Sequence, residues 1–246
     1  MPEKRMRIFA GPNGSGKSSL FQNLQNSGKF NAPYFLNADL LEKQIRELGL
    51  INLSDLNIAP DESSFNNYLE SSTIGKTALK EGLKINLQLV DNFLVNRSRQ
   101  TNSYEASLAA SFIRKALIES QQSFAFETVM SHRSKLEEVQ FANNAGYRTY
   151  LYFVSTESPL INLDRIQTRV AKGGHPVEKD KVLSRFTNSL SLLLDAILLV
   201  RRAYIFDNSG KENRLIAEFY NGVLKNTNTK DLPFWFHKNV LQKISF

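Results

Sequence analysis

The chain has 246 residues, of which 41% are apolar and 11% aromatic, enough to bury a core and to exclude a mainly disordered chain. It has no cysteine, which excludes disulfides, thiolate metal sites and a cysteine nucleophile, and its three histidines make a histidine-rich metal site unexpected. Lys and Arg number 31 against 24 Asp and Glu, a net charge of +7. Such a balance suits nucleic acid, an anionic membrane or phosphorylated ligands, and only its distribution can distinguish them.

Strands and helices alternate in the first part of the chain. The hydrophobic pattern predicts a buried strand over residues 5–10, a glycine-rich turn, and a helix over residues 17–25. A second strand over residues 33–37 leads into an amphipathic helix over residues 40–48. Helical spacing of leucines and alanines then fills residues 61–121. We interpret this segment as two or three inserted helices with no strand between them.

The alternation continues in the second part. We expect strands over residues 123–128, 147–155 and 203–206, and helices over residues 134–144, 158–172 and 178–202. Strands that alternate with helices favour a mostly parallel sheet with helices on both faces. The sequence therefore predicts a single three-layer α/β domain over residues 1–246, with a five-stranded sheet, the helical insertion at about 61–121, and a C-terminal extension at about 211–246.

No segment predicts export or insertion into a membrane. The N-terminal apolar run is interrupted by Gly11 and Pro12, so it is too short for a signal peptide. The most apolar stretch, residues 190–200, carries Asp195 and falls short of the roughly 20 residues that a span needs. We expect a buried core helix there, no membrane partner, and a cytoplasmic protein.

A phosphate-binding motif lies between the first predicted strand and the first predicted helix. It fits G-x-x-x-x-G-K-[ST], and its residues are Gly11, Pro12, Asn13, Gly14, Ser15, Gly16, Lys17 and Ser18, with Ser19 next in the helix. Glycines let backbone N–H groups close around phosphates at the positive end of a helix. Lys17 is expected to reach the β- and γ-phosphates, and the Ser18 hydroxyl to bind Mg²⁺. The motif predicts a P-loop NTPase-type fold that binds ATP and Mg²⁺.

Three classes of nucleotide enzyme share this loop. An ABC-type ATPase should carry an LSGGQ-like segment and a strand that ends in Asp-Glu, and the chain matches neither. A regulatory GTPase should carry Asn-Lys-x-Asp, which is absent. A kinase that phosphorylates a small molecule needs a carboxylate beside the acceptor and arginines over the transferring phosphoryl group, and the sequence offers candidates for both.

Asp39 is the candidate carboxylate. It follows the second predicted strand, at the sheet edge where parallel-sheet proteins bind ligands. In phosphoryl transfer such a group accepts the proton of the attacking hydroxyl. The alternative is that Asp39 is the N-cap of a helix that begins at Leu40.

Glu127 and Thr128 end the third predicted strand in the same way. A charged residue after Ser-Phe-Ala-Phe does not serve sheet packing, so a contact to the substrate or to a magnesium-bound water is expected. The alternative is a strand-end charge exposed to solvent.

The positive charge is concentrated between residues 165 and 185, which contain six basic residues and two acidic ones. Arg165 and Arg169 lie one helical turn apart and share a face, so they can converge on a polyphosphate, with Arg185 further along. Gly173 and Gly174 allow a bend, as a closing lid requires. The alternative is a solvated basic face. With the phosphate loop, this distribution predicts a nucleotide polyphosphate rather than nucleic acid as the partner.

The ordered set of motifs resembles the zeta toxin family of P-loop kinases over about residues 6–210. The set comprises the phosphate loop, Asn37-Ala-Asp39, Phe126-Glu127-Thr128, Arg165-x-x-x-Arg169-Val170, Gly173-Gly174-His175 and Arg185-Phe186. Studied members of that family phosphorylate the sugar 3′-hydroxyl of UDP-N-acetylglucosamine with ATP, and some are inhibited by a small antitoxin.

The resemblance implies a role for each matching residue. Lys17 and Ser18 serve ATP and Mg²⁺, Asp39 is the general base, Glu127 and Thr128 hold the substrate, and Arg169, Arg185 and Arg165 bind phosphates. Two departures concern the acceptor: Val129 stands where the family often has threonine, and Pro176 follows His175 directly. We therefore expect an ATP-dependent kinase of a small-molecule hydroxyl, such as a nucleotide sugar, with an antitoxin as a partner. An ATPase that transfers no phosphoryl group, and a nucleotide-dependent interaction module whose basic segment binds nucleic acid, stay open as alternatives.

Overall fold

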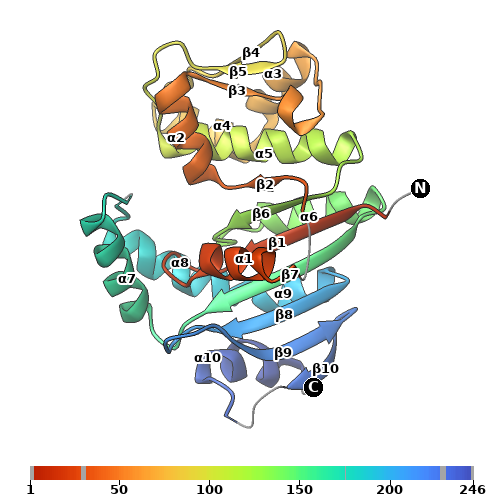
Figure 1. The fold of residues 1–246 in the computed structure, drawn as a ribbon, viewed down its shortest axis with the longest axis vertical. Helices are drawn as coiled ribbons and strands as arrows, with labels where there is room; N and C mark the ends of the chain where they lie inside the picture. Colours follow the sequence, from red (N-terminus) through yellow and green to blue (C-terminus); the bar gives the residue numbers. More distant parts are fainter. Residues whose placement is uncertain (1–2, 29–31, 175, 228–230, 245–246) are drawn as a thin grey trace. The chain divides into compact units, whose positions relative to one another are not determined.

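The computed structural model describes residues 3–28, 32–174, 176–227 and 231–244 (Figure 1). The contacts within the chain divide it into two compact units. The first unit combines Met1–Ala32 with Ala125–Phe246, and the second is Pro33–Phe124.

The first unit carries the larger sheet. In chain order its elements are β1 (Arg5–Ala10), α1 (Lys17–Asn26), β6 (Phe124–Thr128), α6 (Ser134–Asn144), β7 (Arg148–Ser155), α7 (Pro159–Ala171), α8 (Lys179–Ser191), α9 (Leu193–Leu199), β8 (Arg202–Asp207), β9 (Arg214–Tyr220), β10 (Val223–Thr227), α10 (Phe234–Phe236), η2 (His237–Leu241) and α11 (Gln242–Ile244). The strand–loop–helix unit at the phosphate motif and the strands that were expected at 123–128, 147–155 and 203–206 are confirmed.

The sheet is mostly parallel, as expected, but it is larger than expected. Among the described residues it has seven strands, in the order β10-β9-β8-β7-β1-β6-β2, where β2 is the two-residue strand Phe35–Leu36. β1 pairs with β7 and β7 with β8 in parallel, whereas β8, β9 and β10 pair antiparallel. The prediction of five strands was wrong because β9 and β10 extend the sheet.

A tight hairpin accounts for the two additional strands. Asn221 and Gly222 join β9 to β10, and both have positive φ angles, 48° and 75°. A two-residue turn of this kind matches the twist of antiparallel strands, and Asn-Gly is its preferred sequence. The C-terminal extension therefore adds a β-hairpin before its short helical turns.

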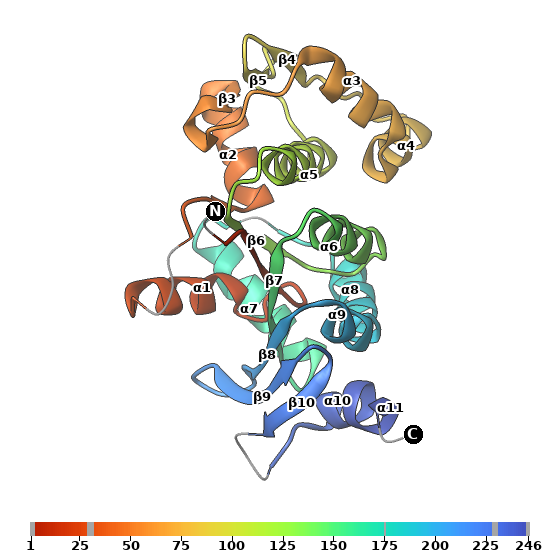
Figure 2. The same cartoon turned by 90° about the vertical axis from the view of Figure 1, so that its right-hand side faces the viewer.

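Helices cover the sheet on both sides, with α1 and α7 on one side and α6, α8 and α9 on the other (Figure 2). The strand residues Ile8, Leu151 and Ile205 are fully buried. Helix α7 begins as its sequence predicts: Pro159 occupies the first turn, and the side chain of the N-cap Ser158 accepts a hydrogen bond from the Leu160 N–H.

The helix expected over residues 178–202 is two helices, because the chain bends by 43° between α8 and α9. The Ser191 hydroxyl, at the end of α8, donates a 2.8 Å hydrogen bond to the backbone carbonyl of Asn188. Such bonds from a serine to its own helix compete with the helical ladder and favour a bend. Within the described ranges, no single helix is long and apolar enough to cross a membrane, although the bent pair α8 and α9 together reach that length and composition.

The second unit is mainly helical and includes a small sheet. Its elements are β2, α2 (Ala38–Leu48), β3 (Leu50–Asn52), η1 (Ser54–Leu56), α3 (Glu62–Ser71), α4 (Thr73–Lys80), β4 (Gln88–Val90), β5 (Phe93–Val95) and α5 (Ser103–Glu119). Helix α5 is largely buried and packs against α2 and α4.

The expectation that no strand lies between residues 61 and 121 was wrong. β3, β5 and β4 form an antiparallel sheet in that order. Asp91 and Asn92 join β4 to β5, with positive φ angles of 47° and 65°. Leu87, Leu89 and Leu94 are buried. Their spacing imitated helical periodicity, because strands of three residues are too short to display alternation.

Candidate functional site

The phosphate loop joins β1 to α1, and its glycines are required by its conformation. Gly11, Gly14 and Gly16 have φ angles of 139°, 76° and 98°. A Cβ at Gly11 would lie 2.0 Å from the Val154 carbonyl oxygen, and one at Gly14 would lie 2.6 Å from that of Asn162. The loop therefore has a shape that only glycine permits at these positions, as a backbone cradle for phosphate requires.

Side chains from α1, from α7 and from the segment after β8 donate hydrogen bonds to the backbone carbonyl groups of this loop. Lys17 Nζ donates to the Pro12 carbonyl at 2.9 Å. The Asn162 amide, from α7, donates to the Asn13 carbonyl at 2.7 Å, and the Asn208 amide, from just after β8, donates to the Ser15 carbonyl at 2.7 Å. Both asparagines are buried. Since each buried carbonyl has a donor, the path of the backbone is fixed by the fold around it.

Asn162 and Asn208 were not predicted, and each is itself held in place. Asn162 is fully buried and hydrogen-bonds to the Thr156 hydroxyl. The backbone N–H of Asn208 donates to the Ser155 carbonyl at 2.8 Å. The only signal in the sequence is that the polar residues 155–156 and 207–208 follow predicted strands, at the same sheet edge as the phosphate loop.

Ser15 and Lys17 supply polar groups inside the loop. Ser15 is fully buried, and among the described residues its hydroxyl has no hydrogen-bond partner. A buried polar atom of this kind indicates a missing ligand or water. Lys17 is 5% exposed at its side chain. A glycine cradle, an unpartnered hydroxyl and a buried lysine fit a nucleotide phosphate.

Glu127 lies at this loop. Its carboxylate accepts a 2.7 Å hydrogen bond from the Ser18 hydroxyl, and Lys17 Nζ lies 3.7 Å from its other oxygen. Its side chain is 15% exposed, so it is not the solvated strand-end charge that was the alternative. β6, which carries Glu127, neighbours β1 in the sheet. The structure thus brings Lys17, Ser18 and Glu127 together.

The Ser18 and Glu127 oxygens fit a magnesium ion. Mg²⁺ binds in nucleotide enzymes through one or two protein oxygens together with substrate phosphates and water. In the described part of the chain no three or more His, Cys, Asp or Glu side chains cluster as metal ligands. The donor set is therefore that of an ion bound jointly with a polyphosphate and not of a site built by the protein alone.

Thr128, the second residue predicted at this strand end, shapes the turn that follows. Its hydroxyl accepts a hydrogen bond from the Met130 N–H at 3.2 Å, and Met130 is buried with a φ angle of 54°. The Ser189 hydroxyl, from α8, donates to the Val129 carbonyl at 2.8 Å. This turn is thus fixed by contacts from both sides.

The three predicted arginines lie in different surroundings. Arg185 Nη1 lies 3.5 Å from the Asn13 side-chain oxygen, at the phosphate loop. Arg165 Nη2 donates to the Gly210 carbonyl at 3.0 Å, while its Nη1 is buried without a partner among the described atoms. Arg169 is exposed on α7. The structure brings Arg185 to the loop and ties Arg165 to the segment after β8.

The predicted lid consists of the end of α7, a turn and the start of α8. Gly174 closes the end of α7, because its N–H donates to the Arg169 carbonyl at 2.9 Å. A Cβ at Gly174 would lie 2.6 Å from Arg169 Cγ, so this turn also requires glycine. His175, which was assigned to the lid, lies outside the described residues.

Asp39 lies in the second unit, in the first turn of α2. The helix begins at Ala38, and the side chain of Asn37 is its N-cap, accepting hydrogen bonds from the N–H groups of Asp39 and Leu40. The alternative in which Asp39 is itself the N-cap was wrong. The Asp39 side chain is exposed.

Comparisons with known proteins show the fold. No protein-family model and no curated protein matches the chain. A chain from the AvrRxo1-ORF1:-ORF2 complex with ATP has a TM-score of 0.52 and 13% identity, over 91% of this chain and 60% of that chain. The same complex with sulphate ions gives a TM-score of 0.51 and 13% identity over the same shares. The PezAT toxin-antitoxin system of Streptococcus pneumoniae gives a TM-score of 0.48 and 12% identity, over 89% of this chain and 72% of that one.

The chain spans about 60% of the length of the AvrRxo1 chains that it matches. The shared part is the α/β fold with a mostly parallel central sheet flanked by helices, which confirms the predicted fold class. At 13% identity the similarity concerns the fold alone.

Proposed function

We propose that the protein is an ATP-dependent phosphotransferase that transfers the γ-phosphoryl group to a hydroxyl group of a small molecule. The observation that carries this proposal is the meeting of Lys17, Ser18 and Glu127 at a glycine loop whose carbonyl groups are held from outside. A structure with the same fold was crystallised with ATP, which supports the choice of nucleotide.

The residues of the loop have distinct tasks in this proposal. Backbone N–H groups of residues 13–19 bind the phosphates at the N-terminus of α1, and Lys17 neutralises charge on the β- and γ-phosphates. Ser18 and Glu127 hold Mg²⁺. When bound, the ion neutralises charge that develops on the phosphate oxygens. Arg185, beside Asn13, stabilises the transferring group, with Arg165 and Arg169 as further phosphate ligands.

Asp39 is proposed as the general base. The acceptor hydroxyl oxygen forms a bond to the γ-phosphorus, the bond from that phosphorus to the bridging oxygen of ADP breaks, and the hydroxyl proton passes to the Asp39 carboxylate. Two facts about its own unit support this role: the Asp39 side chain is exposed, and the N-cap of α2 is Asn37 and not Asp39.

The acceptor is proposed from the zeta toxin resemblance as a nucleotide sugar such as UDP-N-acetylglucosamine, with Thr128 beside it. The contacts of Glu127 favour the magnesium side for this residue over the acceptor side. An antitoxin is proposed as a protein partner, because the AvrRxo1 neighbours were crystallised as complexes of two components.

The test is ATP turnover with a panel of nucleotide sugars, nucleosides and simple sugars, measured as ADP release and as phosphorylated product by mass spectrometry. We expect one acceptor class to stimulate turnover, and Asp39→Asn to reduce that stimulated rate by about 100-fold or more while ATP binding is retained. An unchanged Asp39→Asn rate would contradict the role of Asp39. If no acceptor stimulates turnover, the ATPase alternative is favoured.

A further inference from the structure

One face of the large sheet differs in chemistry from the other. The strand residues that point toward α6, α8 and α9 are fully buried aliphatic side chains such as Leu151 and Ile205. The alternate residues toward the amino ends of the same strands are tyrosines and arginines, whereas Val154 and Phe206 nearer the carboxyl ends are apolar. In a doubly covered parallel sheet, both faces are normally apolar. This difference indicates that part of the second face does not pack against helices.

Cross-strand pairing gathers these polar residues at the amino ends of β7 and β8. Tyr150 pairs with Arg202, and Arg202 with Tyr220, in neighbouring strands. Tyr220 pairs in turn with Val223 across the hairpin. We define the Arg/Tyr surface by these residues and their neighbours: Arg148, Tyr150, Arg201, Arg202, Tyr204, Tyr220 and Val223.

No described helix covers the Arg/Tyr surface. On this side of the sheet, α1 lies at β1, where Phe21 packs edge-on against Phe9 with ring centroids 5.2 Å apart, and α7 lies at the carboxyl ends of the strands (Figures 1 and 2). Arg202 is exposed, and Val223 is 56% exposed. The surface is thus accessible from solvent.

The aromatic rings on this face are already stacked. Tyr152 lies between Phe9 and Tyr204, with centroid distances of 4.8 and 5.1 Å and interplanar angles of 7° and 18°. The Arg201 and Arg202 guanidinium groups lie 5.5 and 5.4 Å from the centre of the Tyr220 ring. Because the ring faces are occupied, the surface offers mainly phenolic hydroxyls and guanidinium N–H groups to a partner.

The positive charge of this surface is only partly neutralised within the described part of the chain, where Glu218 lies opposite Tyr204. Arg201 Nη2 donates to the Tyr220 hydroxyl at 3.1 Å, and Arg202 Nη1 donates to the Tyr204 hydroxyl at 3.3 Å, but neither arginine forms an ion pair there. Arg148 does pair with a carboxylate, that of Glu3, in an exposed contact. Arginines whose partners are neutral hydroxyls keep their charge available for an anionic ligand.

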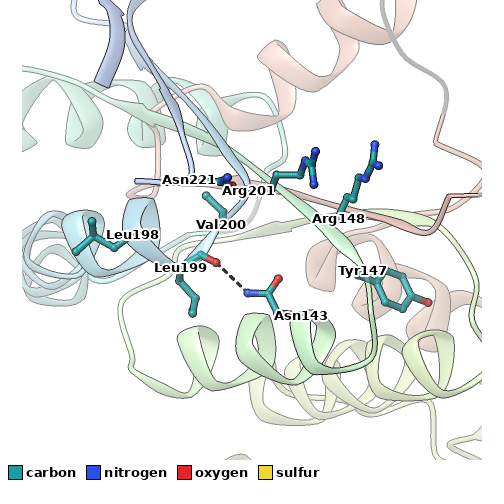
Figure 3. A pocket seen from close by; sticks show the side chains of 8 residues that line it. All are labelled: Asn143, Tyr147, Arg148, Leu198, Leu199, Val200, Arg201 and Asn221. Atoms are coloured by element: carbon teal, nitrogen blue, oxygen red, sulfur yellow. Dashed lines mark hydrogen bonds between the residues drawn. The ribbon is translucent and has the colours of Figure 1, made fainter. Parts of the chain in front are cut away.

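A cavity of about 270 Å³ adjoins the surface at the amino ends of β7 and β8. Arg148 and Arg201 line it, and their side chains extend in the same direction (Figure 3). Its apolar wall includes Leu198, which is 57% exposed. The Asn143 amide donates to the Leu199 carbonyl at 2.9 Å, and the lining combines polar side chains with the aliphatic ones.

We propose that the Arg/Tyr surface and this cavity bind an acidic segment of a partner protein. The carboxylates of the segment pair with Arg201 and Arg202, and one aliphatic side chain packs on the exposed Leu198 at the edge of the cavity. Arginine and tyrosine are enriched among the residues that dominate the binding energy of protein interfaces. The proposal is independent of the nucleotide site, which lies at the opposite ends of these strands.

Single-stranded nucleic acid fits this surface less well. Sequence-tolerant binding of nucleic acid depends on bases that stack on free aromatic faces, and here those faces are taken by neighbouring rings and guanidinium groups.

The test is fluorescence anisotropy with a labelled short peptide of glutamates that flank two leucines, with the full chain at low and at physiological salt. We expect saturable binding that weakens by about tenfold or more in the double variant Arg201→Glu/Arg202→Glu and in Leu198→Asp, because rim charge and buried apolar contact are both lost. The double variant Lys238→Glu/Lys243→Glu changes two exposed lysines of the same unit by the same total charge as the arginine variant and should leave binding unchanged.

Two outcomes would overturn the proposal. One is peptide binding that is absent, or that is equal in the wild type and in both test variants, when thermal unfolding shows that all are folded. The other is tighter binding of a labelled oligothymidine than of the peptide, with loss of that binding in the arginine variant, which would assign the surface to nucleic acid. ATP turnover should stay at the wild-type level in Leu198→Asp, so a general loss of structure is distinguishable.

Discussion

The two ends of the parallel strands in the first unit both carry positive charge, but different groups supply it at each end. At the carboxyl ends, a glycine loop and the N-terminus of α1 form the candidate phosphate site, and Lys17 is held by a carbonyl and a carboxylate. At the amino ends, guanidinium groups are held by tyrosines on an open sheet face. The first arrangement suits a small polyphosphate, and the second suits a larger acidic partner. The charge of +7 is therefore not explained by the nucleotide site alone.

The largest effect on ATP turnover is expected for Lys17→Ala, at the carboxyl ends of the strands. Removal of the ammonium group deprives the phosphates of a preorganised charge, so ATP turnover should fall by about 100-fold or more. Lys238→Ala, which removes an exposed lysine of the same unit, should keep the wild-type rate. Turnover is measured as ADP release at saturating Mg²⁺. Equal rates in the two variants would contradict the assignment of the loop.

Asn208→Ala and Asn143→Ala compare the same kind of bond at the two ends. Each removes an amide that donates to a backbone carbonyl, at the phosphate loop or at the cavity. Leaving a buried carbonyl without a donor costs about 1–3 kcal/mol. We expect Asn208→Ala to weaken ATP binding roughly 5- to 100-fold, because the loop loses its fixed path, whereas Asn143→Ala should reduce only the free energy of unfolding.

Calorimetric ATP titration and urea unfolding of both variants check this expectation. Asn208→Asp keeps the size of the side chain but lacks the amide donor, so it should resemble the alanine variant. Wild-type affinity in Asn208→Ala would contradict the role of this residue.

A smaller effect is expected at alkaline pH, where ionisation of Tyr152 in the stacked row of rings changes the free energy of unfolding. Burial, and secondarily the neighbouring Tyr204, raise the pKa of Tyr152 to about 12. In the unfolded chain this phenol ionises near pH 10, so between about pH 10 and 12 the unfolded state loses the proton first and the folded state is destabilised. We expect a slope of up to about 1.4 kcal/mol per pH unit from Tyr152, and a shallower slope in Tyr152→Phe. Identical slopes in urea unfolding would contradict this.

The sequence predicts local features of the first unit well and the supporting contacts poorly. The phosphate loop is a contiguous motif with a backbone requirement, so its glycines and its place between a strand and a helix could be predicted. Asn162 and Asn208 could not, because they reach the loop from positions about 150 and 190 residues away. Glu127 was placed at the correct sheet edge, but its contact with Ser18 depends on the pairing order of the strands.

The errors in the predicted fold have two physical origins. Both unexpected hairpins turn through two residues with positive φ, Asp91-Asn92 and Asn221-Gly222. The second pair, Asn221-Gly222, is a strong hairpin signal in the sequence, but hydrophobic periodicity does not detect it. The first joins strands of only three residues, which periodicity cannot resolve. At the bend, the Ser191 side chain bonds to its own helix, and an apolar pattern contains no sign of this contact.

Calorimetric titration of the wild-type chain with ATP, in the presence and absence of Mg²⁺, tests whether the carboxyl end of the sheet is a magnesium–nucleotide site. We expect one site per chain, affinity that rises with Mg²⁺, loss of binding in Lys17→Ala, loss of the Mg²⁺ effect in Glu127→Gln, and unchanged binding in Leu198→Asp. ATP binding that persists in Lys17→Ala with wild-type affinity would contradict this assignment.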